Sequence, residues 1–225
     1  MSRALRTGLV LVACWLAAAA ARGPDPGASL AGRYARLLVR HRPDLAARWG
    51  ASVKSSEPFV PLDEAALAAH VRALEALARE AGALPAGASS DTLRDRLAFE
   101  LAQCAPGGAL RRDPFLWLDL VEAAVLAPFA PGTPAGCRQI ARATEQLRLV
   151  PRALRAGAVL LRGAPEPDPA AFERRLTELE HRLRRELPER TRACKESRRL
   201  AEFAEADTLA AASLSDFRHR LTPGP

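Results

Sequence analysis

The chain has 225 residues and a formal net charge of +7, and 48% of its residues are hydrophobic. That length is enough for one large or two small domains with a substantial apolar core. Alanine, leucine, arginine and glutamate favour helix, whereas aromatic residues make up only 5% of the chain and β-branched residues are few, so the composition argues against sheet-based folds. We expect an all-α fold, a multi-helix array of antiparallel helical hairpins.

The positive charge does not predict a nucleic-acid partner. Lys54 and Lys195 are the only lysines, and an arginine bias beside abundant alanine, proline and glycine indicates a GC-rich coding sequence. Arg3 and Arg6 also fall in a segment that we expect to be removed, so the mature protein is less basic than the whole chain.

Residues 1–22 have the pattern of a signal peptide. Two arginines precede an apolar run from Leu9 to Ala21. This run is shorter than the roughly 20 residues that span a bilayer, but it suits the hydrophobic region of a secretory signal. Cleavage is expected after Ala19, Ala20 or Ala21.

Two other readings of the same segment stay open. Leu11-Val12-Ala13-Cys14 fits a lipoprotein processing site, so Cys14 is a possible lipidation site, although the apolar run continues beyond it. The segment could also remain as an uncleaved N-terminal anchor. All three readings predict export to the periplasm, the cell envelope or the extracellular space, with the membrane contacted only through this segment.

The other cysteines are Cys104, Cys137 and Cys194. An odd number permits at most one intramolecular disulfide and leaves one free thiol, and the pairing stays open. The chain has no Cys-x-x-Cys pair, which argues against zinc-ribbon and thioredoxin-type sites. Cys104 continues a helical stripe of leucines, at 93, 97 and 101, and is expected to be a small buried apolar residue.

The first third of the mature chain predicts four helical segments. After a flexible leader at 23–28, Ser29 is expected to cap a helix that ends at Arg42-Pro43. A short helical turn follows over 44–50, and 51–61 forms a loop. A helix over 62–84 and a second one, capped by Ser90 or Asp91, are expected to pack as an antiparallel pair. The apolar positions of these helices are Leu30, Tyr34, Leu37 and Leu38, then Leu67, Val71, Leu74, Leu77 and Ala78, then Leu93, Leu97, Leu101 and Cys104.

Asp113-Pro114 opens a helix that is apolar nearly all round, which predicts the core helix. Pro128 to Pro134 ends it, and Thr133 is a candidate cap for a helix bearing Ile140, Ala143 and Leu147. Pro151 is expected to kink or divide that path, so that 112–169 would hold three segments separated by proline.

A proline-rich connection over 163–169 precedes the last two predicted helices. Residues 169–187 carry an amphipathic stripe that Pro188 interrupts, and the final helix is expected over 189–219. The stripe consists of Phe172, Leu176, Leu179, Leu183 and Leu187. Residues 29–221 are expected to form a single helical domain, with a tail at 222–225.

We find no constellation of catalytic, cofactor-binding or metal-ligating residues, and expect no cofactor. The histidines are His41, His70, His181 and His219, and none pairs with another at the spacing of a metal site on one helix. The closest motif, Glu178-x-x-His181, lies off the apolar stripe and is expected to face water. No serine follows the pattern of a nucleophile elbow.

A basic cluster is the remaining candidate for a binding surface. Its glutamate neighbours stand at spacings that permit i, i+3 and i, i+4 ion pairs, and no aromatic residues alternate with the arginines. We therefore expect a self-neutralising helix surface and no nucleic acid. The cluster consists of Arg182, Arg184, Arg185, Arg190, Arg192, Lys195, Arg198 and Arg199.

Several stretches in this order resemble the N-terminal half of the bacterial family called domain of unknown function 885. They are Tyr34 to Gly50, Asp91-x-Leu93-x-x-x-Leu97, Arg112-Asp113-Pro114-Phe115 followed by Phe129-Ala130-Pro131, Leu147 to Leu154, and Ala158-x-x-Leu161. The resemblance covers most of the mature chain and rests on apolar and proline positions.

The resemblance implies an exported, all-helical protein whose full-length relatives are about twice as long and resemble zinc-dependent peptidases. The family's metal-binding signature, His-Glu followed by Pro-Gly-His, lies in the other half and has no counterpart here. We therefore expect a truncated member, a binding or structural module that catalyses nothing alone. One chain of a split peptidase whose partner is the missing half, or an unrelated periplasmic interaction protein, are the alternatives. A missing catalytic half would leave a contiguous apolar patch exposed.

Overall fold

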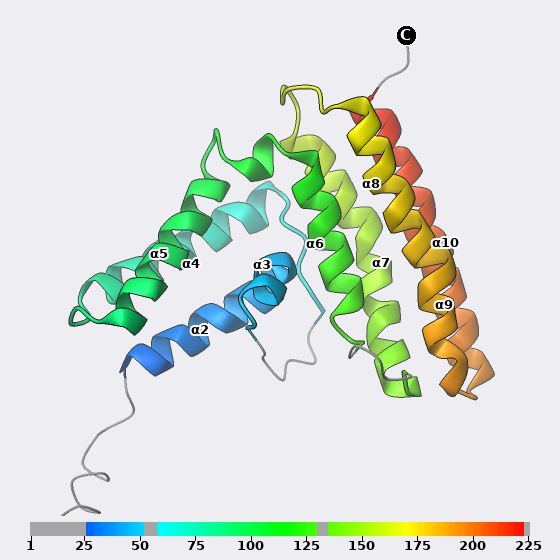
Figure 1. Ribbon diagram of the computed structural model, residues 1–225, viewed down its shortest axis with the longest axis horizontal. Coiled ribbons are helices and arrows are strands. Elements are labelled where there is room, and N and C mark those ends of the chain that lie inside the picture. Colours follow the sequence, from blue (N-terminus) through cyan, green and yellow to red (C-terminus); the bar gives the residue numbers. More distant parts are fainter. Residues whose placement is uncertain (1–25, 52–57, 130–134, 223–225) are drawn as a thin grey trace, which may run out of the picture.

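The computed structural model describes residues 26–51, 58–129 and 135–222. These residues confirm the all-α prediction, since they form helices and no strand. Two groups of helices lie side by side along the chain, α2 to α5 and α6 to α10 (Figure 1). Within the described residues, none of the helices is both long enough and apolar enough to cross a membrane.

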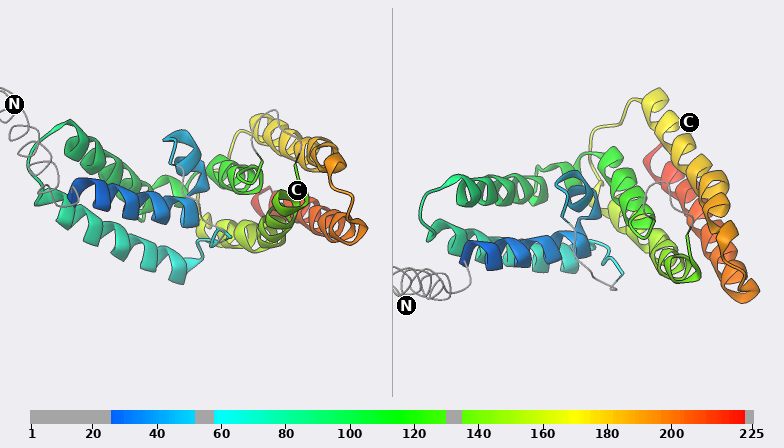
Figure 2. Two further views of the ribbon diagram at one scale, coloured as in Figure 1. Left: turned by 90° about the horizontal axis from the view of Figure 1, so that it is seen from below. Right: turned by 60° about the horizontal axis from the view of Figure 1, so that its bottom comes forward.

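The first group contains the long hairpin of α4 (Glu64–Gly82) and α5 (Ala88–Cys104). Helix α2 (Pro26–His41) packs against α4 and α5, and the short helix α3 (Pro43–Arg48) turns from its end toward the second group. The hairpin reaches away from that group, so α3 is the part that lies next to α6 (Figure 2). The predicted break at Arg42-Pro43 is confirmed.

The second group is built on a continuous pair, α7 (Cys137–Leu160) and α10 (Ser197–Leu221), whose contact is the most extensive in the protein. Helix α6 packs on α7 and links the two groups. Helices α8 and α9, with the turn η2 between them, run along α10 (Figure 1). The others in this group are η1 (Ala109–Arg111), α6 (Pro114–Leu126), α8 (Pro169–His181), the π-helical turn η2 (Arg182–Glu186), α9 (Leu187–Arg190) and η3 (Thr191–Ala193).

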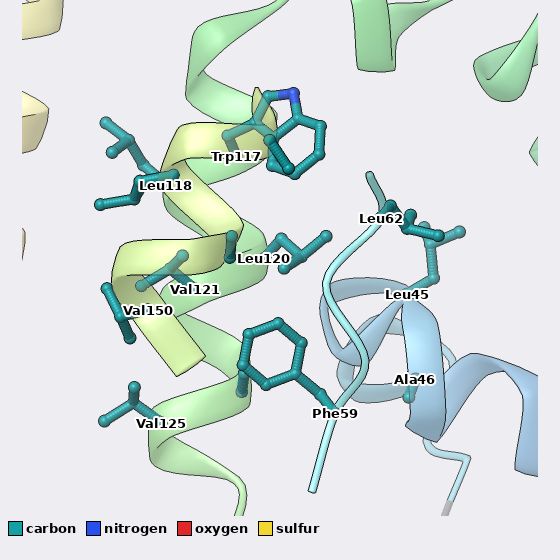
Figure 3. Close-up of a cluster of buried hydrophobic side chains, with 14 of the residues drawn as sticks. Leu45, Ala46, Phe59, Leu62, Trp117, Leu118, Leu120, Val121, Val125 and Val150 are labelled. Atoms are coloured by element: carbon teal, nitrogen blue, oxygen red, sulfur yellow. The ribbon is translucent and has the colours of Figure 1, made fainter. Parts of the chain in front are cut away.

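Helix α6 is the core helix, as its sequence predicts. Asp113 caps it by accepting a hydrogen bond from the Phe115 amide at 2.9 Å, and its buried residues include Trp117, Leu120 and Val121. On the side of the first group, Phe59 and Leu62 lie between α3 and α6, and Phe59 points toward α6 (Figure 3). The hydrophobic core therefore runs without interruption from one helix group to the other.

Two predicted helix starts are wrong by a few residues. Helix α2 begins at Pro26, inside the predicted leader, because proline fits the first helical turn, where an amide hydrogen has no partner anyway. Helix α5 begins at Ala88 after Gly87, so neither Ser90 nor Asp91 is its cap. The Ser90 hydroxyl instead donates to the backbone carbonyls of Pro85 and Gly87.

The prediction that 112–169 holds three segments is wrong, because Pro151 lies inside α7 and does not divide it. A proline in a helix interior costs about 3 kcal/mol. Here the residues on either side, among them Leu147, Val150 and Leu154, are buried, and their burial keeps the helix continuous.

The predicted helix over 169–187 becomes α8 followed by η2, whose wider turn leads into α9 with Pro188 in its first turn. The stripe from Phe172 to Leu187 is buried as predicted. The final helix begins at Ser197, not at 189, because Cys194 is extended and joined to Cys137. The predictions for residues 1–22, Cys14 and Thr133 lie outside the described residues.

Candidate functional site

Three buried polar side chains and the partly buried His41 lie together where α2, α4 and α5 meet. Glu100 of α5 is fully buried and accepts a hydrogen bond from the Tyr34 hydroxyl at 2.8 Å. Its other oxygen lies 2.6 Å from His70 Nε2. The His41 ring, on α2, lies beside the His70 ring, with 4.9 Å between their centroids.

The hydrogen bonds of this cluster define the tautomer of His70. A carboxylate only accepts, so Nε2 carries the hydrogen that is donated to Glu100. The Nδ1 atoms of both His70 and His41 are buried and have no hydrogen-bond partner. Burial, together with the neighbouring His70, lowers the pKa of His41 to about 4.

Arg42 lies next to this cluster and is completely buried. Its Nε and Nη2 atoms donate to the two carboxylate oxygens of Asp44, at 3.0 and 2.7 Å, and Nη2 also donates to Gln103 Oε1 at 2.6 Å. A buried guanidinium is tolerated because this paired, hydrogen-bonded geometry offsets its lost hydration. Arg42 thereby ties the end of α2 to α3 and α5.

Asp44 and Gln103 also line a cleft that has a volume of about 1390 Å³. The cleft lies between α3 and α6. Its walls carry small side chains, Ala46 and Ala47 on α3, Ala123 on α6 and Ala127 just after α6. These small side chains leave room between the two helices, while Arg42, Asp44 and Gln103 set the direction of α3.

The rim of the cleft carries both signs of charge. Asp119 and Glu122 are paired with Arg175, and Glu122 also with Arg182. Arg48, Arg142 and Glu145 lie on the rim as well and are exposed. Leu45 and Phe59 also line the cleft, although both side chains are almost completely buried.

The free thiol of Cys104 lies at the C-terminal end of α5, and its predicted burial is confirmed. Burial and the charge of Glu100 raise its pKa to about 12. A thiol of this kind stays protonated at neutral pH and is a poor nucleophile. The neighbouring His70–Glu100 pair therefore does not form a cysteine–histidine nucleophile with Cys104.

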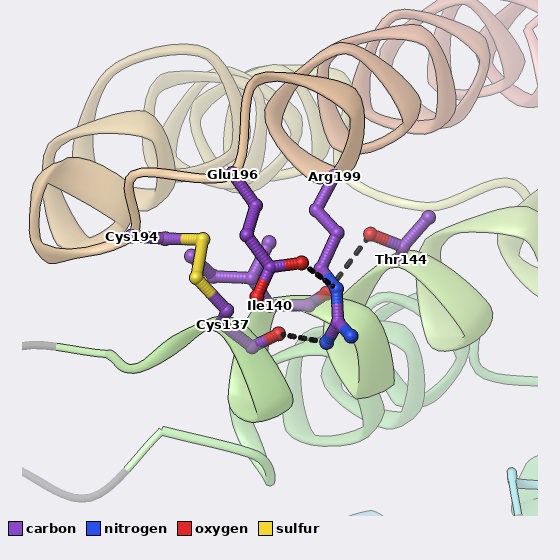
Figure 4. The surroundings of a disulfide bond; sticks show 6 residues. All are labelled: Cys137, Ile140, Thr144, Cys194, Glu196 and Arg199. Atoms are coloured by element: carbon purple, nitrogen blue, oxygen red, sulfur yellow. Dashed lines mark hydrogen bonds and ion pairs between the residues drawn. A yellow bond between two sulfur atoms is a disulfide. The ribbon is translucent and has the colours of Figure 1, made fainter.

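Cys137 and Cys194 form the one disulfide that the cysteine count permits, across a sequence separation of 57 residues. Glu196 and Arg199 pair beside it, and Arg199 Nη1 donates to the Cys137 carbonyl at 3.0 Å (Figure 4). The two sulfur atoms and the Glu196 carboxylate lie close enough together to hold one metal ion. Sulfur atoms that are joined in a disulfide, however, offer no thiolate to a metal.

The remaining sequence candidates lie on the surface. Glu178 and His181 are exposed, with relative side-chain exposures of 63% and 64%, so this motif faces water as predicted. In the basic cluster, Arg192, Arg198 and Arg199 pair with nearby glutamates at the predicted helical spacings, and Arg182 pairs across to Glu122.

The buried cluster around Glu100 was missed by the sequence analysis because its histidines come from different helices. The signal that could have found it is positional. Glu100 stands seven residues after Leu93 and three after Leu97, and His70 stands between Leu67 and Leu74, so both polar residues occupy core positions of their helices.

Comparison with models of protein families, with curated proteins and with solved structures finds no match for this chain.

Proposed function

We propose that this chain is an exported, non-catalytic binding module that holds a segment of a partner polypeptide in the cleft between α3 and α6. The cleft carries the proposal. Pockets for small molecules usually have volumes of about 300–1,000 Å³, whereas this cleft has about 1390 Å³. Its lining combines apolar residues with charges of both signs, which suits a peptide that carries apolar side chains and mixed charge.

The surface of the described residues favours the interpretation that the chain is a self-contained module. It argues against the alternative that the chain is one half of a split peptidase. Only Phe99, Val159 and Leu209 among them are large hydrophobic residues with exposed side chains. They stand on three different helices, α5, α7 and α10, and Phe99 packs edge-on against Trp49. A face that a second half normally covers would offer a larger contiguous apolar patch.

The binding proposal is tested with peptides selected from a displayed random library on the mature, full chain. Ala123 is partly buried on the cleft wall, and Ala123→Trp should fill the space and weaken each peptide's Kd at least tenfold. The matched control is Ala204→Trp, at an exposed position of α10, which should leave the Kd unchanged.

Peptides that bind Ala123→Trp as tightly as the unmodified chain would overturn the cleft as the site. Circular dichroism melting checks that both variants fold. Cleavage of the selected peptides by the isolated chain would contradict the non-catalytic role. Recovery of the protein from the native envelope or medium tests export, and mass analysis of its N-terminus distinguishes a start after one of Ala19 to Ala21, a lipid on Cys14 and an uncleaved N-terminal anchor.

A further inference from the structure

We propose that His41 and His70 form a binding site for a transition-metal ion such as zinc. The site lies between α2 and α4, away from the residues that line the cleft. It is independent of the peptide-binding proposal, because neither histidine contributes to the cleft wall.

The first observation is the pair of unpartnered nitrogens. His70 is 1% exposed, and Nδ1 of both His70 and His41 is buried without a hydrogen-bond partner. A buried polar atom without a partner is costly, and native proteins contain few of them. In a neutral His70 ring whose Nε2 donates to Glu100, Nδ1 carries a free electron pair.

The second observation is the distance between the rings. Zinc–nitrogen bonds of about 2.0–2.1 Å at a tetrahedral angle hold the centroids of two bound imidazoles about 5 Å apart. The centroids of His41 and His70 are 4.9 Å apart, with the ring planes tilted by 53°. Two imidazoles in a common ligand shell have this separation.

The third observation is the hydrogen-bond chain behind His70. Metal-bound histidines usually donate their other ring hydrogen to a carboxylate, which fixes the tautomer and the ring orientation. Glu100 accepts from His70 Nε2 at 2.6 Å and is itself held by the Tyr34 hydroxyl at 2.8 Å. Tyr34 and Glu100 therefore act as positioning residues for His70.

The two ligand nitrogen atoms also determine which class of metal ion the site would bind. Imidazole nitrogen suits zinc, copper, nickel and cobalt, whereas magnesium and calcium require oxygen ligands. Within the described ranges, no third cysteine, histidine or carboxylate completes a three-ligand group with these two histidines. Water would have to complete the coordination of the ion, and it would enter from the side of His41, which is only partly buried.

The test is titration of the full mature chain, without a histidine tag and with its disulfide oxidised, with ZnCl₂ by calorimetry and with CoCl₂ by visible absorption. One ion should bind per chain. His41→Gln removes a ligand at a partly exposed position and should weaken the Kd at least tenfold. Glu100→Gln should weaken it by 10- to 100-fold, as is usual when the carboxylate behind a ligand is lost.

The matched control is His181→Gln, because His181 is an exposed histidine on α8, and this change should leave the Kd unaltered. The proposal is overturned if the unmodified chain binds neither Zn²⁺ nor Co²⁺, or if His41→Gln binds them equally well. A cobalt–thiolate absorption band would also overturn it, since it would show that Cys104 is a ligand. Circular dichroism of each variant separates loss of a ligand from loss of the fold.

Discussion

At the scale of single residues, two buried positions show how closely the packing constrains the sequence. Gly157 of α7 faces Trp117, and a methyl group added to it would lie 2.6 Å from the indole ring. The indole Nε1 also donates to the Leu110 carbonyl at 3.0 Å, so the ring is held in place. The other position is Asp207, which is buried on α10 with Oδ1 lacking a partner.

Gly157→Ala is expected to destabilise the fold by about 1–3 kcal/mol, because overpacking against a fixed ring outweighs the usual helical gain of alanine over glycine. The measurement is the free energy of unfolding in urea. Gly32→Ala is the matched control, since its added methyl meets only the tip of Arg36 at 3.9 Å. The control should stabilise α2 by about 0.5–1 kcal/mol, and equal effects of both changes would contradict the expected clash.

Burial raises the pKa of Asp207 from 3.8 to about 6, against an opposing effect of Arg184. The fold therefore favours the protonated carboxyl. The stability that this group contributes is complete below pH 3.8 and is lost as the pH rises through 6.

Asp207→Asn should consequently raise the free energy of unfolding at pH 7 by about 2 kcal/mol, at roughly 1.4 kcal/mol for each pKa unit with an allowance for partial solvation. The gain should disappear near pH 4. Urea unfolding at both pH values measures it, and an equal gain at the two values would show that removal of the charge is not the cause.

At the scale of elements, the pair α7 and α10 is held by packing and by one covalent link. The disulfide joins the first residue of α7 to the segment that precedes α10, with 4.9 Å between the two Cα atoms. It closes a loop that contains the rest of α7, α8, η2 and α9. Both prolines that the sequence suggested as breaks, Pro151 and Pro188, lie within this loop and inside helices.

Replacement of both Cys137 and Cys194 by serine should lower the free energy of unfolding by about 2–4 kcal/mol, because a loop of this length loses substantial entropy in the unfolded chain when it is closed. Urea unfolding with and without a reductant measures it. The reductant should destabilise the unmodified chain and leave the double variant unaffected. A double variant as stable as the oxidised chain would show that packing alone holds the pair.

At the scale of the whole molecule, periodicity and proline positions predicted most of the helices and several of the apolar faces that they bury, but not the polar residues inside the core. The stripe of α4 was predicted through Val71 and Ala78, which are only partly buried, while His70 is in the core. Hydrophobic patterns assign polar residues to the surface. They therefore fail where polar groups from separate helices satisfy one another inside, as Tyr34, His70 and Glu100 do.

The cleft could not be predicted from the sequence, for a related reason. Alanines on α3 and α6 are compatible with close packing of the two helices as well as with a space between them. The outcome depends on how Arg42, Asp44 and Gln103 set the direction of α3, and these three residues come from separate elements. The disulfide pairing likewise follows from the meeting of α7 and α10, which local patterns do not encode.

The position of the disulfide has a consequence for a chain that has been cut. The connection 162–168 between α7 and α8 is largely exposed, and it separates Cys137 from Cys194. A protease that nicks it would produce two pieces that remain one covalent molecule. They would migrate together on a gel until a thiol reagent released them, so the intact and the nicked protein look alike under non-reducing conditions.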